Sequence, residues 1–258
     1  EVFAEKYGSS TILDIRRQST DWGKAVAMAF ASSEVRTGIA ILEQENRIKW
    51  QSDANESMQA LLTDWHKSSY NLEDKLILAV TNKDTVALNH GVRQYLKAEG
   101  VLTGQEIAVA GNHYMQGDRI LITKSHKAKS HKAESHKELG LINGDIATIS
   151  YASSEQFIIK TAADKELSFN PAEYHGFRHG YATTIFKAQG ASVKDVYLFH
   201  NGFAGLRNSY VALSRNINEL NLYVIKASTA EQESLIKQLS YDPEIGSSLN
   251  YLTFEEAQ

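Results

Sequence analysis

The chain has 258 residues, of which 42% are hydrophobic and 22% are charged, and its formal net charge is -4 at pH 7. This composition is typical of a globular protein with one large domain or two small ones. The net negative charge excludes a protein that coats nucleic acid by bulk charge, but not a local basic groove. The absence of cysteine excludes disulfides and thiolate metal sites and favours a reducing compartment. No apolar run approaches the ~18 residues that span a bilayer, and the start at Glu1, without methionine or a signal-like segment, indicates a piece of a longer protein.

The first predicted elements surround a pair of arginines. A short strand over Thr11 to Ile15 runs into Arg16-Arg17-Gln18, and Ser19 is placed to cap a helix with apolar residues at i, i+4 and i+8. Adjacent arginines at a strand–helix junction usually form a solvated or acid-paired corner. The alternative is that one guanidinium binds a phosphate through two hydrogen bonds, which the planar geometry of the group allows.

Residues 37–80 predict a helix, a short strand, a second helix and a buried strand. Asp53 and Glu56 have the spacing of a capping box at the start of the second helix. Leu76 to Val80 is a continuous apolar run, typical of a strand inside a parallel sheet. The polar pair Thr81-Asn82 follows at its carboxyl end, where an N-cap for the next helix is the simplest interpretation. The apolar positions expected in the core of the second helix are Met58, Leu61, Leu62 and Trp65.

From Gln105 to Asn170 the pattern changes to short strands without intervening helices, which indicates a small β-barrel. Asn143-Gly144 is a tight-turn signal before one of these strands. We therefore expect residues 1–104 and 171–240 to form one α/β domain and residues 105–170 to be an insertion within it. Residues 241–258, with an acidic end, are expected to be a tail or linker.

Residues 124–138 contain an internal repeat in which Ser-His-Lys recurs every five residues. Steps of five turn successive histidines away from one another on a helix and alternate faces on a strand, so no regular element gathers all three. We therefore expect no metal site there. A mobile hairpin loop is the simplest interpretation of this low-complexity segment, and its lysines leave open a contact with phosphates.

Two stretches near the end of the chain surround a predicted strand, Val193 to His200. Residues 179–190, HGYATTIFKAQG, predict a short helix that carries two threonines and ends at Gln189-Gly190, and residues 208–216, NSYVALSRN, predict a helix that carries Ser214-Arg215. This order places a glycine turn, a lysine and an arginine at the edge of a sheet, where phosphates bind in open α/β proteins. By spacing alone, an ordinary βα unit with surface charges is the preferred interpretation of the same pattern.

The stretches TTIFKAQG and YVALSRN together resemble the fifth and sixth motifs of superfamily-one DNA helicases, in particular the RecD-like branch. One departure is Phe186, where the branch usually has histidine. In these helicases the fifth motif touches single-stranded DNA and the nucleotide phosphates, and the sixth supplies an arginine finger. The resemblance thus assigns Arg215 to nucleotide binding and catalysis. It assigns DNA contacts to Thr183, Thr184 and Lys187, and nucleotide contacts to Gln189 and Gly190.

Two earlier segments also resemble helicase motifs, and they extend the comparison to most of residues 1–240. Residues 15–18 are similar to the fourth motif, which implies that Arg17 contacts the γ-phosphate and takes part in catalysis. Thr81 and Asn82 are similar to a Thr-Asn pair that meets the DNA backbone. RecD-like helicases carry an SH3-like barrel where this chain changes pattern. The resemblance therefore implies an α/β fold: a RecA-like parallel sheet flanked by helices, with an inserted small SH3-like β-barrel.

The sequence contains no G-x-x-x-x-G-K-[ST] motif and no convincing Walker B strand, which phosphoryl transfer requires for positioning and metal binding. The resemblance implies that ATP and Mg²⁺ are bound mainly by an upstream P-loop motor domain of the same protein. We expect this fragment alone to bind no cofactor and to be inactive.

The stretch from Leu13 to Trp65 resembles the helicase part of conjugative relaxases of the Ti-plasmid TraA and MobA type. This implies single-stranded DNA and a relaxase domain as further partners, the bacterial cytoplasm as location, and no membrane association. Two alternatives remain from the sequence. One is a non-catalytic single-stranded DNA-binding remnant of a split or degraded helicase. The other is an unrelated α/β nucleotide-binding protein, whose sheet would carry no barrel insertion.

Overall fold

The computed structural model describes residues 16–130, 139–188, 192–202 and 204–241. The strand expected over residues 11–15 and the tail expected over residues 242–258 lie outside these ranges. Gln189 and Gly190 also lie outside them, so their predicted nucleotide contacts are not described.

One part of the molecule is a five-stranded parallel sheet. Its strands are β1 (Ile48–Gln51), β2 (Lys75–Ala79), β12 (Ala182–Thr184), β13 (Val193–His200) and β14 (Asn216–Ile225). They follow the order β1-β14-β13-β2-β12. All five residues of the internal strand β2 are buried, as the continuous apolar run predicted.

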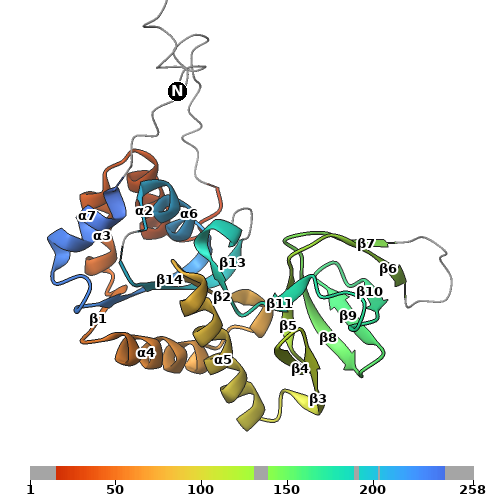
Figure 1. Ribbon diagram of the computed structural model, residues 1–258. Coiled ribbons are helices and arrows are strands. Elements are labelled where there is room, and N and C mark those ends of the chain that lie inside the picture. The colour runs from red at the N-terminus through yellow and green to blue at the C-terminus, as the bar shows by residue number, and fades with distance from the viewer. Residues whose placement is uncertain (1–15, 131–138, 189–191, 203, 242–258) are drawn as a thin grey trace, which may run out of the picture.

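Helices cover both faces of this sheet, so that the α/β region has three layers (Figure 1). The helices are α2 (Asp21–Ala31), α3 (Val35–Gln44), α4 (Ala54–Lys67), α5 (Asn82–Ala98), α6 (Leu206–Leu213) and α7 (Gln232–Ser240). Leu76 and Leu78 face the core under α2, α3, α6 and α7, whereas Ile77 and Ala79 face the core under α4 and α5. The predicted parallel sheet flanked by helices is therefore confirmed.

Two helix starts test the cap predictions. Asp53 caps α4, because its Oδ1 accepts hydrogen bonds from the backbone N–H groups of Asn55 and Glu56, as predicted. The cap of α2 is Thr20 and not Ser19. The Ser19 hydroxyl instead lies within 2.8 Å of Asn218 Oδ1 and donates to the carbonyl oxygen of Ile217. A tertiary contact has thus moved the cap by one residue.

The other part of the molecule consists of short antiparallel strands. They are β3 (Thr103–Val109), β4 (Asn112–Gln116), β5 (Arg119–Ile122), β6 (His126–Ser130), β7 (Leu139–Leu141), β8 (Ile146–Ala152), β9 (Phe157–Thr161), β10 (Glu166–Phe169) and β11 (Phe177–His179). We call residues 103–179 the β region. Seven strands follow the linear order β11-β5-β8-β9-β10-β6-β7, and β3 and β4 form a separate hairpin. Because β11 pairs with β5, this region extends beyond the boundary expected at residue 170. A closed SH3-like barrel stays a prediction.

The histidine repeat is only partly a loop. Residues 126–130 form β6, which pairs with both β10 and β7, and the ring of His126 stacks on Tyr174 with 4.4 Å between centroids. The expectation of a mobile loop over residues 124–138 was therefore wrong for β6, because pairing on two sides outweighs the low complexity of the sequence. Residues 131–138 lie outside the described chain.

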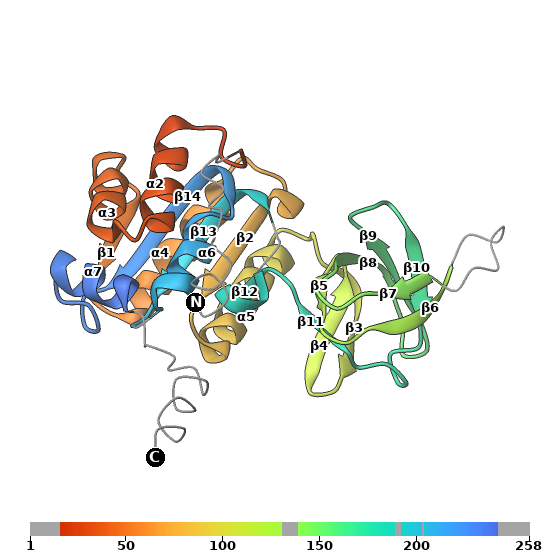
Figure 2. The ribbon, with the colours of Figure 1, turned by 90° about the horizontal axis from the view of Figure 1, so that it is seen from above.

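A buried polar network joins the two regions, which lie side by side next to β12 and α5 (Figure 2). Asp118, fully buried in the β region, accepts hydrogen bonds from Arg93 Nε at 2.9 Å, from the Tyr181 hydroxyl at 2.9 Å and from the Met115 backbone N–H at 2.8 Å. The neighbouring Arg119 donates its backbone N–H to the Tyr181 hydroxyl at 3.0 Å. We call Arg93, Asp118, Arg119 and Tyr181 the junction network.

Candidate nucleotide and nucleic-acid interface

Arg17 and Gln18 are fixed against the connection between α6 and β14. Arg17 Nη1 donates to the carbonyl oxygen of Ser214 at 2.7 Å, although the two residues are 197 positions apart. Gln18 Nε2 donates to the carbonyl oxygens of Ser214 and Asn216, at 3.0 Å each. The segment that resembles the fourth motif therefore lies directly against the segment that resembles the sixth.

Arg215 belongs to the second of these segments and lies just after the end of α6, not within that helix as the sequence predicted. Its Nε donates to the carbonyl oxygen of Val211 at 2.9 Å and its Nη2 to Ser214 Oγ at 3.2 Å. Burial, and then the positive charge of Arg17, lower the pKa of the Arg215 guanidinium. The structure thus brings two arginines from distant parts of the chain within electrostatic reach of each other.

This arginine pair lies at the amino ends of the strands. Arg215 precedes β14, and its carbonyl oxygen accepts from the backbone N–H of Val193, the first residue of β13. Ligands of open α/β sheets usually bind at the opposite, carboxyl edge. The arginine pair therefore lies at the edge of the sheet opposite to that general site, and a phosphate site there stays a prediction.

Thr81 and Asn82 lie at the carboxyl end of β2, and both side chains are exposed. Thr81 is the N-cap of α5, because its hydroxyl accepts from the Asp84 backbone N–H at 3.1 Å and donates to Asp84 Oδ2 at 2.7 Å. The N-cap interpretation is confirmed. The contact with DNA stays a prediction for both residues.

Thr183 and Thr184 are buried residues of the edge strand β12 and not of a helix. A 3-10 turn, η2 (Ile185–Ala188), begins only after them. The side chain of Asn89 on α5 holds the start of β12, because its Oδ1 accepts from the backbone N–H groups of Tyr181 and Ala182 at 3.0 Å each. Pairing with β2 and the hydrogen bonds to Asn89 hold these residues in the extended conformation. Burial limits the area of either threonine side chain that DNA can contact.

Lys187, the third residue predicted to contact DNA in this stretch, is exposed on η2 beside Phe186, whose side chain is 75% exposed. Partial desolvation, and then the charge of Arg178, lower the pKa of Lys187. Arg178 lies on β11, and its Nη2 donates to Thr183 Oγ1 at 2.9 Å. No motif in the sequence pointed to Arg178, because a single arginine in a three-residue strand has no periodic signal.

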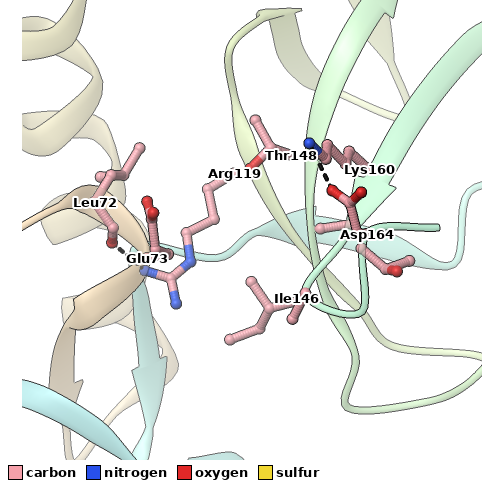
Figure 3. Close-up of a pocket in the computed structure, with 10 residues that line it drawn as sticks. Leu72, Glu73, Arg119, Ile146, Thr148, Lys160 and Asp164 are labelled. Carbon is pink, nitrogen blue, oxygen red and sulfur yellow. Dashed lines mark hydrogen bonds and ion pairs between the residues drawn. The ribbon is translucent and has the colours of Figure 1, made fainter. Parts of the chain in front are cut away.

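Two larger cavities lie between the sheet and the β region. One, of about 500 Å³, has Lys187 and Arg119 in its lining. The other, of about 430 Å³, also contains Arg119 (Figure 3). In Figure 3 the Arg119 guanidinium points toward Leu72, to whose carbonyl oxygen it donates at 2.7 Å, and away from the ion pair of Lys160 and Asp164. Arg119 therefore ties the β region to the sheet, and its hydrogen bonds point to the backbone.

Two further properties concern the binding of metal ions and the crossing of membranes. Within the described ranges, no three histidine, aspartate or glutamate side chains cluster closely enough to hold a metal ion. In the same part of the chain, no helix has the length and apolar character required to cross a bilayer.

Comparisons with known proteins bear on the predicted family resemblance. No protein-family model matches the chain. The conjugal transfer protein TraA of Agrobacterium fabrum is 26% identical over 246 residues, which cover 93% of this chain and 21% of that protein. A probable conjugal transfer protein TraA of Sinorhizobium fredii is 26% identical over 256 residues, covering 97% of this chain and 22% of that protein. The chain thus spans about a fifth of the length of these relatives.

Among solved structures, Bacteroides Pif1 bound to single-stranded DNA aligns with a TM-score of 0.51 and 12% identity, covering 87% of this chain and 54% of that chain. At this level of identity the likeness concerns the fold. The predicted resemblance to the helicase part of TraA-type proteins is confirmed: the chain is a homologue of one segment of TraA conjugal transfer proteins, with a fold similar to that of a Pif1 helicase.

Proposed function

We propose that this chain is the second motor domain of an ATP-dependent DNA helicase, in the helicase module of a conjugative DNA-transfer relaxase. The observation that carries the proposal is the hydrogen bond from Arg17 to the carbonyl oxygen of Ser214, next to Arg215. The helicase resemblance assigned Arg17 to the γ-phosphate and Arg215 to catalysis as an arginine finger. Their proximity in the structure is what such a shared task requires.

The donor set at the arginine pair fits a nucleotide phosphate. Guanidinium groups bind phosphate oxygens through paired hydrogen bonds, and two neighbouring cations in a desolvated place are stabilised by an anion between them. When bound, ATP supplies the phosphoanhydride bond that is hydrolysed. Arg17 and Arg215 would bind its terminal phosphate and stabilise the charge that develops on it. An upstream P-loop domain would hold the remaining phosphates and Mg²⁺.

The arginine pair lies apart from the two cavities beside the β region. Among the described residues, neither Arg17 nor Arg215 lines the cavities of about 500 and 430 Å³ beside the β region. A site completed by a second domain needs no enclosed pocket in the first. The amino edge of the sheet suits this arrangement, because there the arginines can reach a ligand that is held mainly by another domain.

The DNA contacts form the second part of the proposal. Asn82 begins α5 just after β2, and Lys187 lies on η2 just after the edge strand β12. Both side chains are exposed. Thr81, Thr183 and Thr184 complete the predicted set. The TraA relatives are named as conjugal transfer proteins, and the solved Pif1 structure contains single-stranded DNA, which supports this role. The alternative of a DNA-binding remnant without turnover has no observation of its own in its favour.

The decisive experiment measures DNA-stimulated ATP hydrolysis in a polypeptide that contains this chain and the upstream P-loop domain. An arginine that meets charge in the transition state of phosphoryl transfer contributes roughly 10³–10⁵ in rate. We therefore expect Arg215→Ala to lower kcat by about this factor while nucleotide binding changes much less. Arg215→Lys should rescue poorly, because an ammonium cannot reproduce the planar fork. Arg36→Ala, an exposed arginine paired with Glu233, is the matched control.

A second measurement tests whether the two arginines act together. Arg17→Ala should also be severe, and the double variant with Arg215→Ala should lose much less than the product of the two single losses. The chain alone should hydrolyse no ATP, with or without DNA. Near-normal turnover by the Arg215→Ala polypeptide, or turnover by the purified chain alone that Arg215→Ala abolishes, would contradict the proposal.

A further inference from the structure

Arg178 adjoins three positions that the sequence assigned to DNA from separate segments. Its Nη2 donates to Thr183 Oγ1 on β12 at 2.9 Å. With Asn82 at the start of α5, it lines a small cavity of about 80 Å³. Thr183 in turn lines the larger cavity of about 500 Å³ together with Lys187. Arg178 is therefore the side chain on which the β region meets the predicted DNA surface.

Arg178 and Lys187 carry positive charges that no acid neutralises within the described residues. Other arginines have carboxylate partners: Arg36 pairs with Glu233, Arg47 with Glu219, and Arg93 with Asp118. In the described part of the chain, no ion pair joins a carboxylate to Arg178 or Lys187. Glu73 and Asp145 line the same cavity as Lys187, but neither forms an ion pair with it.

The surroundings of the two cations favour an anion between them. Desolvation lowers the pKa of Arg178, and partial desolvation together with the charge of Arg178 lowers the pKa of Lys187. Arg178 Nε is buried and has no hydrogen-bond partner in the structure. A buried donor without an acceptor is costly, and two like charges at close range raise each other's energy. Both effects are relieved by a bound oxyanion.

We propose that Arg178 and Lys187 together hold one phosphodiester group of single-stranded DNA where the β region meets β12. This inference rests on the proposed function, because it adds a contact to the same DNA surface. The amino end of the 17-residue helix α5 adjoins the cavity through Asn82. A helix amino terminus stabilises a nearby phosphate, which agrees with the same placement. The β region thus takes part in DNA binding through Arg178.

The experiment measures binding of a fluorescein-labelled oligothymidylate to this chain by anisotropy over a range of salt concentrations. Arg178→Gln keeps an amide that can donate to Thr183 but removes the charge. Loss of a charge-assisted hydrogen bond should weaken binding about tenfold at low salt. The slope of log K against log salt should fall in magnitude by about 0.7, the value for one phosphate on a single strand. Lys187→Gln should act similarly, and the double variant should lose less than the product of the single losses.

Three controls separate the possible outcomes. Arg36→Gln, an exposed arginine far along the chain, should leave affinity and slope unchanged. Arg178→Lys should restore the slope if charge is what binds, and thermal melting should show that Arg178→Gln remains folded. If the unaltered chain binds DNA but Arg178→Gln binds with the same affinity and slope, the inference is overturned and the proposed function stands. If the unaltered chain shows no salt-dependent binding, both are overturned.

Discussion

The core under α2, α3, α6 and α7 and the core of the β region are packed with different side chains. In the first, aliphatic residues predominate, and Phe30 is the one aromatic residue among its fully buried described members. In the second, aromatic rings contact one another: Tyr114 lies 5.0 Å from Phe177 and 6.1 Å from Phe157 between ring centroids. The core on the other face of the sheet, under α4 and α5, also contains aromatic residues, among them Trp65, Tyr181 and Phe199. A region of short strands has fewer positions, and large rings bury more area at each.

Neither of these two cores extends across the boundary between the regions, although Met115 of the β region packs against the core under α4 and α5. The junction network of Arg93, Asp118, Arg119 and Tyr181 joins them instead. Hydrogen bonds between fixed donors and acceptors are directional, whereas an apolar contact tolerates sliding. Each region is therefore stabilised by its own apolar core, whereas the orientation of one region relative to the other depends on a few buried polar groups. Changes to those groups should therefore separate the two regions.

The largest effect is expected at Asp118. Removing one partner of a buried ion pair costs about 3–5 kcal/mol. Because Arg93 keeps a second partner, Glu106, at 3.1 Å, Asp118→Ala should lower the free energy of unfolding by an amount near the lower end of this range. All three tryptophans lie in the first 65 residues, in the α/β region, so tryptophan fluorescence reports on that region alone. In the variant the far-UV circular dichroism transition should begin at lower urea than the fluorescence transition.

The control for this prediction is Lys160→Ala, which removes an exposed ion pair with Asp164 and should leave both transitions in place. Coincident transitions in Asp118→Ala, with little change in midpoint, would show that the network does not hold the regions together.

A smaller effect is expected at Gly180, which lies between β11 and β12. A Cβ atom there would lie 2.9 Å from the carbonyl carbon of Ile120 and 3.0 Å from the backbone nitrogen of Leu121. Backbone atoms of a paired strand cannot move away as a side chain can, so Gly180→Ala should lower the free energy of unfolding by roughly 1–3 kcal/mol. Gly140→Ala, where the nearest atom is 3.8 Å away, is the matched control. Equal midpoints in urea for the two variants would contradict this close approach.

The smallest effect concerns pH. Burial lowers the pKa of His179, in the β region, to about 4, and lowers the pKa of His200 under α7. Both histidines bind protons more weakly when folded, so protonation of the unfolded chain destabilises the fold as pH falls below the ordinary histidine value of about 6.5. Stability from His179 should therefore be present above about pH 6.5 and decline toward pH 4.

The measurement is the free energy of unfolding in urea at a series of pH values. His179→Gln, which retains a donor for the carbonyl oxygen of His113, should flatten the decline between about pH 6.5 and 4. His175→Gln, an exposed histidine nearby in the sequence, should leave it unchanged. An equal slope in all three proteins would show that His179 is not protected from protonation by burial.

Strands with strong local patterns were predicted well from the sequence. The bounds of β13 at Val193–His200 are confirmed, because apolar residues fix a strand without outside help. The short strands β6, β11 and β12 were not predicted. Their residues become extended by pairing with β10, β5 and β2, and three to five residues carry too little periodicity to indicate this.

The candidate site, like the strands, was predictable from the sequence only in part. The sequence by itself determined which segments are candidates for the chemistry, since Arg17, Thr81-Asn82, Lys187 and Arg215 stand in stretches that resemble helicase motifs. Only the tertiary structure decided which of them meet. The strand order β1-β14-β13-β2-β12 and the hydrogen bonds of Arg17 and Gln18 to the start of β14 bring the two arginines together. Local patterns record whether a residue faces a core or solvent, whereas contacts between segments nearly 200 residues apart depend on how the whole sheet is ordered.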